Sequence, residues 1–406
     1  MSVFGAEGQT QGQFQQSLNK VFIFYGVGFA AFVIVLGVLE QMGMPKEYIG
    51  YAFLAATVLL YGGIGVMSRT NDAAEYYVAG RRVPAIYNGM ATGSDWMSAA
   101  SFIGMAGTLY LTGYGGLAFI LGWTGGYCLV ALFLAPYLRK FGQFTIPDFL
   151  GARYGGNMAR LIGVFAAILV SFVYVVAQIF GVGLITARLT GLSFEVGVYV
   201  GLAGILVCSF LGGMRAVTWT QVAQYLILIV AYMIPVVWLS VKHTSNPVPQ
   251  ISYGYLLEKV TAKEEQLLKD PKELEVRGIF KARADAAAEK LKDVPAAFAA
   301  DKEAATKKLE ELKAANAPEA EIKAATAAIA ALPKDEAAAK TAYTAARTTN
   351  TARAAPPLRH AEPFPGKDDA ARDISRKNFL ALVFCLMIGT AALPHILMRF
   401  YTVPSV

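Results

Sequence analysis

The segment Met90-Ala-Thr-Gly-Ser-Asp-Trp-Met-Ser-Ala-Ala-Ser-Phe-Ile-Gly-Met105 places one carboxylate, Asp95, near the middle of an apolar stretch over residues 84–111. A charged residue at the centre of a membrane helix costs about 2.5–3.5 kcal/mol on insertion scales, so such residues usually serve a function. The Gly, Ser and Thr residues around it favour an interrupted helix. We predict a break at residues 93–95 whose oxygens meet an ion or a polar solute. The alternative is an Asp95 that caps a half-helix or bonds to a neighbouring helix.

The rest of the chain is typical of an integral membrane protein, since 55% of its 406 residues are hydrophobic and its mean hydropathy is +0.45. A transmembrane helix needs about 20 predominantly apolar residues. Eight segments meet this requirement: residues 21–42, 49–67, 84–111, 113–138, 161–187, 194–211, 217–241 and 379–400. We therefore predict an all-α membrane protein with a polar tail at residues 1–20, seven transmembrane helices over residues 21–243 and an eighth over residues 378–406.

Lysine and arginine are unevenly divided between the short loops. The opposite loops carry two, Lys46 and Arg188, whereas alternate loops carry nine: Lys20, Arg69, Arg81, Arg82, Arg139, Lys140, Arg153, Arg160 and Arg215. By the positive-inside rule, the amino terminus and the basic loops face the cytoplasm. The formal net charge of +7 then reflects loops that face anionic lipid head groups, so we expect a lipid bilayer and no nucleic acid among the partners.

Polar residues in two of the spans extend the candidate site. Ser98 and Ser101 follow the break, and Tyr174 and Gln178 lie one turn apart on one face of the span at residues 161–187. Hydroxyl and amide groups on one face are suited to a solute path. Hydrogen bonds between helices are an equally good explanation of Tyr174 and Gln178.

The last span is also interrupted. Pro394 removes a backbone donor and frees a carbonyl, and Gly389, Thr390 and His395 lie close to it. Two broken helices separated by intact ones are typical of a binding site at the bilayer midplane, so we place these three residues on the solute path. His395 as a packing or capping residue is the alternative. Arg399, near the cytoplasmic end, is expected to extend to the membrane interface.

Residues 244–377 differ in composition, being rich in Ala, Lys and Glu, and by the loop count they lie on the external side. Strong helix formers predict one helix over residues 295–315, a second that follows a break at residues 316–318 and reaches about residue 331, and a third over residues 333–346. A loose tail is expected at residues 356–365. A docking role for a partner and a tolerated solvated insertion both fit this thin helical hairpin.

The sequence has no GxxxxGK[ST] loop, no HExxH or CxxC pattern and no GxSxG elbow. We therefore expect neither an enzyme nor an organic cofactor. Transport coupled to an ion gradient explains this pattern more simply than nucleotide-driven pumping or enzyme chemistry.

Four motifs resemble those of a known family. Glu75-Tyr-Tyr-Val-Ala-Gly-Arg81 and Gly212-Gly-Met-Arg-Ala-Val-Thr-Trp-Thr-Gln221 resemble two cytoplasmic signatures of sodium:solute symporters. Residues 94–102 and 389–400 are most similar to cation/acetate symporters. The resemblance covers residues 71–242 and 378–406, whereas the long insertion departs from the acetate permease pattern.

This resemblance implies two inverted five-helix repeats preceded by two extra helices, with sodium and solute bound where the first and sixth core helices unwind. Those helices correspond to residues 84–111 and 379–400. The implied sodium ligands lie around Gly93, Ser94 and Met97, with Asp95 nearby.

The expected function is sodium- or proton-coupled symport of a small monocarboxylate, such as acetate, across a bacterial cytoplasmic membrane. The chain ends after the sixth core helix, so we expect an amino-terminal fragment that does not transport alone. A membrane sensor built on a symporter-like domain is the competing function.

Overall fold

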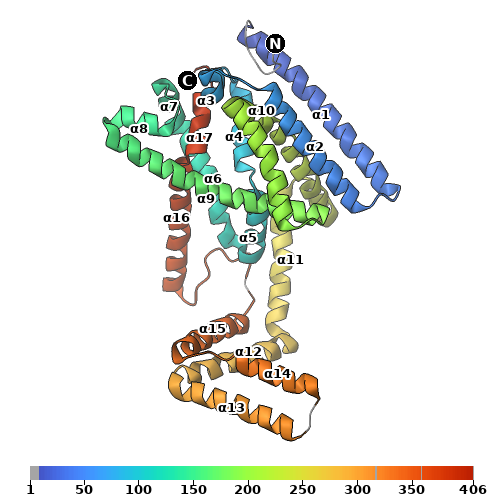
Figure 1. Cartoon of the computed structure of the whole chain (residues 1–406), viewed down its shortest axis with the longest axis vertical. Coiled ribbons are helices and arrows are strands. Elements are labelled where there is room, and N and C mark those ends of the chain that lie inside the picture. The colour runs from blue at the N-terminus through green and yellow to red at the C-terminus, as the bar shows by residue number, and fades with distance from the viewer. Residues whose placement is uncertain (1–8, 316–317, 358, 406) are drawn as a thin grey trace. The chain divides into compact units, whose positions relative to one another are not determined.

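The computed structural model describes residues 9–315, 318–357 and 359–405, and within these ranges the regular structure is helical throughout (Figure 1). The chain forms two compact units, one of residues 1–253 and 362–406 and one of residues 254–361. In chain order, the first unit contains α1 (Gln11–Gln41), α2 (Lys46–Met67), α3 (Ala73–Val78), α4 (Ala85–Trp96), α5 (Met105–Thr112), α6 (Leu117–Leu129), α7 (Ala135–Phe141), α8 (Ile146–Tyr154), α9 (Asn157–Thr190), α10 (Phe194–Thr244), α16 (Asp369–Ala391) and α17 (Pro394–Met398).

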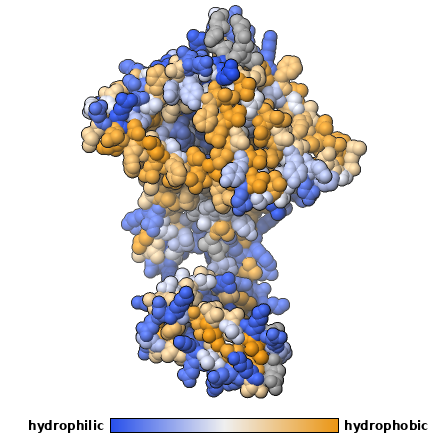
Figure 2. Space-filling view, in the orientation of Figure 1, coloured by the Kyte–Doolittle hydropathy of each residue, from blue (hydrophilic) through white to orange (hydrophobic). Residues whose placement is uncertain are grey.

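Six helical segments in the described ranges are long and apolar enough to cross a membrane: Gln11–Gln41, Lys46–Met67, Ala100–Phe141, Asn157–Thr190, Ser209–Thr244 and Asp369–Ala391. Most of their apolar side chains are exposed, and Figure 2 shows hydrophobic residues over much of this unit's surface, as expected for a face that contacts lipid. Two of the eight predicted spans fall short of this length. The span at residues 84–111 stops as a regular helix at Trp96, and that at residues 194–211 forms only a shorter apolar helix.

The predicted polar tail is helical from Gln11 onward. Thr10 and Gln13 form a capping box, in which each side chain bonds to the other's backbone N–H. Phe14 and Leu18 are then buried within a core cluster that includes Trp219 of α10. The helix therefore starts ten residues before the predicted span because its first turns pack against α10.

The two signature motifs of the sequence contact each other. Gly213 interrupts α10 with φ 51° and ψ −138°, and a Cβ atom there would lie 2.5 Å from the carbonyl oxygen of Tyr76. Both the backbone conformation and the close approach require glycine at this position. The Tyr76 hydroxyl donates to the carbonyl of Ser209 (3.2 Å), and Arg215 forms an ion pair with Glu75 (3.5 Å). The motifs thus fix the interrupted helix α10 against α3.

Glycines of α6 form a close seam with α16. Cβ atoms added at Gly122 and Gly126 would lie 2.4 Å from Cβ of Leu386 and 2.5 Å from Cβ of Thr390, respectively. Small residues allow two membrane helices to approach this closely and to gain van der Waals contact. Gly122 and Gly126, four residues apart on α6, therefore form a packing surface of the small-xxx-small type.

The second unit contains α11 (Pro249–Lys269), which begins a few residues before it, and α12 (Pro271–Lys290), α13 (Val294–Ala314), α14 (Glu319–Ala330) and α15 (Glu336–Ala354). α13 and α14 agree closely with the predicted helices, and α15 starts three residues and ends eight residues later than predicted, whereas α11 and α12 were not predicted. Residues 356–365 are not a loose tail throughout, because His360 Nδ1 contacts Glu264 Oε1 at 2.7 Å.

Asp301 is the centre of a polar contact between three of these helices. It accepts hydrogen bonds from Lys290 Nζ (2.7 Å) and from the Tyr343 hydroxyl (2.7 Å). Burial acts to raise the pKa of Asp301, but the hydrogen bonds from Lys290 and Tyr343 outweigh it and hold that pKa below its usual value. Burial and the bond to Asp301 raise the pKa of Tyr343 to about 12.

Gly126→Ala is expected to lower the thermal stability of the first unit, because the added methyl group meets Thr390 and overpacking costs about 1–3 kcal/mol. Gly107→Ala is the matched control, since a Cβ atom at Gly107 meets nothing within 4 Å. There the better helix propensity of alanine should leave stability unchanged or slightly higher. Thermal unfolding of both variants in detergent measures the difference, and equal midpoints would contradict the seam.

Asp301→Asn is expected to destabilise the contact of α12, α13 and α15 by about 1 kcal/mol at neutral pH. Because the pKa of Asp301 is depressed in the folded state, its contribution is present above the unfolded value of about 3.9 and is lost as pH falls through the folded value. Hydrogen exchange in α13 peptides should be faster in the variant at neutral pH and similar in both proteins at about pH 3. A difference that persists in acid would contradict this role.

Candidate functional site

The helix that carries Asp95 ends at Trp96, and Gly93, Ser94 and Asp95 are all helical. The predicted break at residues 93–95 is therefore wrong by a few residues, because the helix continues to Trp96. Met97 leaves the helix with φ −78° and ψ 56°. The Ser101 hydroxyl donates to the Ser98 carbonyl (3.1 Å) and also to the carbonyl of Trp96. The carbonyls of Trp96 and Ser98 at the break are therefore satisfied within the chain.

The second predicted interruption lies where the sequence places it. α16 ends at Ala391, Leu393 is extended (φ −67°, ψ 121°), and Pro394 opens the short helix α17. Proline suits the first turn of a helix because its missing N–H would be unpaired there. This arrangement puts His395 and Arg399 beyond the interruption.

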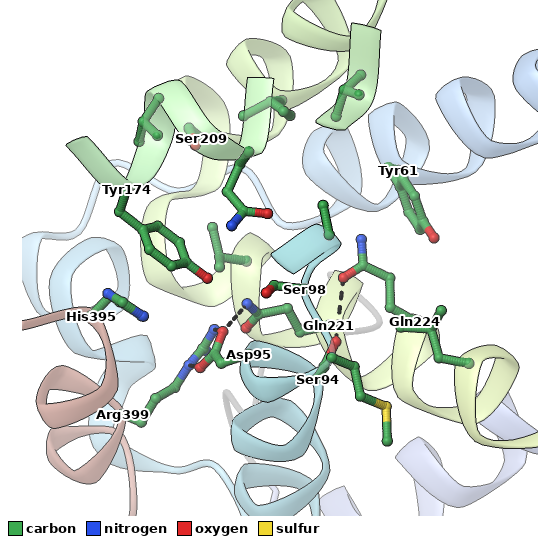
Figure 3. Close-up of a pocket in the computed structure, with 18 of the residues that line it drawn as sticks. Tyr61, Ser94, Asp95, Ser98, Tyr174, Ser209, Gln221, Gln224, His395 and Arg399 are labelled. Carbon is green, nitrogen blue, oxygen red and sulfur yellow. Dashed lines mark hydrogen bonds and ion pairs between the residues drawn. The ribbon is translucent and has the colours of Figure 1, made fainter. Parts of the chain in front are cut away.

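A cavity of about 750 Å³ lies among α4, α9, α10 and α17. Seven of the predicted site residues line it: Ser94, Asp95, Met97, Ser98, Tyr174, Gln178 and His395. Figure 3 shows the Tyr174 hydroxyl directed toward Ser98 and Asp95. The rings of Tyr174 and His395 lie 4.6 Å apart at 31°, so one wall of the cavity is formed by two stacked polar rings. α9 and the two interrupted helices thus meet at one site.

The structure places four other predicted residues away from this cavity. Gly93 packs in α4 against the ring of Tyr225, and Ser101 bonds to the backbone at the break. Gly389 is exposed, and Thr390 is buried against Gly126. These residues shape the helices around the cavity and do not line it.

Asp95 forms a buried ion pair with Arg399. Arg399 Nε donates to Asp95 Oδ2 (2.8 Å), and Arg399 Nη2 donates to Asp95 Oδ1 (3.2 Å). The side chain of Arg399 is 3% exposed and that of Asp95 is 7% exposed. Arg399 Nη1 also donates to the Thr218 hydroxyl at 3.1 Å. The expectation that Arg399 extends to the membrane interface is therefore wrong, because Asp95 provides a counter-charge inside the protein.

Glutamines of α10 complete the polar surface. The Gln221 amide donates to Asp95 Oδ1, and Ser94 Oγ lies 3.5 Å from Gln224 Oε1, as the dashed lines in Figure 3 mark. Gln221 Oε1 is buried and has no hydrogen-bond partner in the described part of the chain. Neither glutamine was predicted as a site residue, although their spacing of three residues within an apolar span was a signal for a shared polar face.

The described residues include no group of three or more His, Cys, Asp or Glu side chains that could hold a metal ion. The site offers instead one carboxylate beside hydroxyl and amide oxygens. Oxygen ligands of this kind suit a hard cation, and the guanidinium of Arg399 suits a carboxylate.

Comparison with known proteins supports the family resemblance inferred from the sequence motifs. Residues 76–271 match the model of the sodium:solute symporter family. The chain is 50% identical over 404 residues to an uncharacterized symporter of Cupriavidus necator. The aligned region covers 98% of this chain and 59% of that symporter. The chain thus spans less than two thirds of the length of that curated relative. No solved structure matches this chain.

Removal of Arg399 alone should be strongly destabilising, because it leaves Asp95 buried without a counter-charge, at a cost of about 3–5 kcal/mol. The double variant Asp95→Asn/Arg399→Gln removes both charges and should be more stable than Arg399→Gln. Thermal unfolding of the two single variants and the double variant gives the coupling free energy, which we expect to exceed about 1 kcal/mol. Additive effects would contradict a direct ion pair.

Proposed function

We propose that this chain belongs to the sodium:solute symporter family, and that the complete protein carries a small monocarboxylate such as acetate across the cytoplasmic membrane together with sodium. The observation that supports this most is the cavity around Asp95, where two interrupted helices meet. Transporters commonly bind solute and coupling ion at such interruptions near the bilayer midplane. A proton carried by the same carboxylate is the alternative coupling ion.

The lining of the cavity fits a short carboxylate. Ser98, Tyr174 and Gln178 offer hydrogen-bond donors, and Arg399 offers a cation. Apolar side chains such as Val175 complete the wall and suit a short alkyl group. One cation, several neutral donors and a mainly apolar surface therefore support a short carboxylate as the solute.

Three contacts between basic loops support the proposed orientation, in which these loops and the amino terminus face the cytoplasm of a bacterial cell. Arg81 donates to the carbonyl of Gly142, and Arg139 Nε donates to the carbonyl of Val403 (2.6 Å). Arg215 pairs with Glu75. Arginines that the loop count assigns to one side thus make contacts within the first unit, and the insertion at residues 244–377 would then be external.

In the proposed cycle, sodium and solute bind together from outside, and the loaded protein changes from an outward-facing to an inward-facing state. Sodium then leaves down its gradient. Simultaneous loading is favoured because each ion offsets the charge that the other brings into a cavity with little water.

Proteoliposomes that contain the complete protein should accumulate radiolabelled acetate when an inward sodium gradient is imposed. Asp95→Ala should raise the half-saturating sodium concentration about tenfold or more. Glu195→Ala is the matched control, because Glu195 lies exposed at the start of α10. Accumulation driven equally by a proton gradient alone, or an unchanged sodium response in Asp95→Ala, would count against sodium coupling at this carboxylate.

A further inference from the structure

The guanidinium of Arg399 already holds a carboxylate, that of Asp95. Its Nε and Nη2 atoms bind the two oxygens of Asp95 at 2.8 Å and 3.2 Å. This two-point geometry is the one in which arginine recognises carboxylates in general. Asp95 therefore occupies the position on Arg399 that the carboxylate of a bound solute would require.

Asp95 in turn lies beside groups that could replace Arg399 as its partner. The Gln221 amide nitrogen donates to Asp95 Oδ1, while Gln221 Oε1 is buried without a hydrogen-bond partner among the described residues. Ser94 and Ser98 line the same cavity with their hydroxyl groups. A cation at this point would gain a carboxylate oxygen, and rotation of the Gln221 amide would supply it with the unpaired oxygen.

The net charge of the cavity shows why such a change of partners would couple two ions. Among the residues that line it, Asp95 and Arg399 are the only Asp, Glu, Lys or Arg side chains, and their charges cancel. A carboxylate that entered alone would bring an uncompensated negative charge into a poorly hydrated site. A cation that entered alone would bring an uncompensated positive charge. The two together leave the cavity neutral.

Building on the symport function proposed above, we propose that Asp95 and Arg399 exchange partners during loading. Sodium takes Asp95, with the Gln221 oxygen as a further ligand, and the released Arg399 binds the carboxylate of the solute. Arg399 Nη1 donates to the Thr218 hydroxyl at 3.1 Å, and this bond does not involve Asp95. Arg399 thus retains one fixed contact while its other donors change from one carboxylate to another. Arg399 is the residue that selects a monoanion.

The release of Arg399 can be measured without any solute. Phenylglyoxal modifies accessible guanidinium groups, and mass spectrometry of peptides quantifies the product at each arginine of the complete protein. Sodium should increase modification of Arg399 several-fold relative to choline, and sodium with acetate should protect it again. Arg188 is exposed and serves as the internal reference that should not respond. Modification of Arg399 that is unaffected by sodium would overturn the exchange of partners.

Binding of radiolabelled acetate to the purified complete protein tests the role of each charge. Asp95→Asn leaves Arg399 without its anion, so acetate should bind about tenfold more tightly in the absence of sodium, and sodium should no longer improve it. Asp95→Asn/Arg399→Gln has no charge to offer and should not bind acetate. Acetamide has nearly the shape of acetate without the charge, and should not compete in either variant. Acetate affinity retained in the double variant would overturn the assignment of Arg399.

The two experiments separate this inference from the proposed function. If the protein accumulates acetate with sodium but Arg399 does not respond to sodium, symport stands and the exchange of partners is wrong. If sodium exposes Arg399 but no monocarboxylate binds, the exchange is supported and the proposed solute is wrong.

Discussion

A carboxylate inside a membrane protein requires a counter-charge, and here that requirement joins Asp95 to Arg399 across 304 residues of sequence. Asp95 lies one residue before the end of α4, and Arg399 directly follows α17. The ion pair therefore connects the ends of two short helical segments, each next to an interruption. Desolvation of the two charges is costly, and the bonds from Gln221 and to Thr218 reduce that cost by satisfying further polar atoms. The cavity is polar where these groups meet and apolar elsewhere.

Close backbone approaches hold this arrangement in place. Gly126 brings α6 against Thr390 of α16, and Gly213 brings the interruption of α10 against Tyr76. Neither position has room for a larger side chain, so these helices around the cavity can approach this closely only with glycine at both positions. The polar groups of the site are thereby carried by backbones with little freedom to separate.

Much of this organisation is visible in the sequence, and the limits have physical causes. The apolar blocks, the interruption at Pro394 and the lone Asp95 follow from hydropathy and backbone chemistry, which are local. The position of the first break depends on Ser101, whose hydroxyl bonds to backbone carbonyls several residues earlier, and no propensity scale includes that bond. The partner of Asp95 depends on tertiary packing, so Arg399 was placed at the interface although its charge made it a candidate. The helices α11 and α12 were not predicted from the sequence.

The distance in sequence between the two charges has a consequence for how the protein is made. At about 5–20 residues per second, the ribosome needs roughly 15–60 s after Asp95 to synthesise Arg399. The carboxylate thus enters the bilayer long before its guanidinium exists, and Gln221, 126 residues after Asp95, is the earlier of these two partners. During that interval the amide of Gln221 is the hydrogen-bond donor available to the carboxylate of Asp95. Correct insertion of this protein therefore relies on a hydrogen bond first and on an ion pair only at the end.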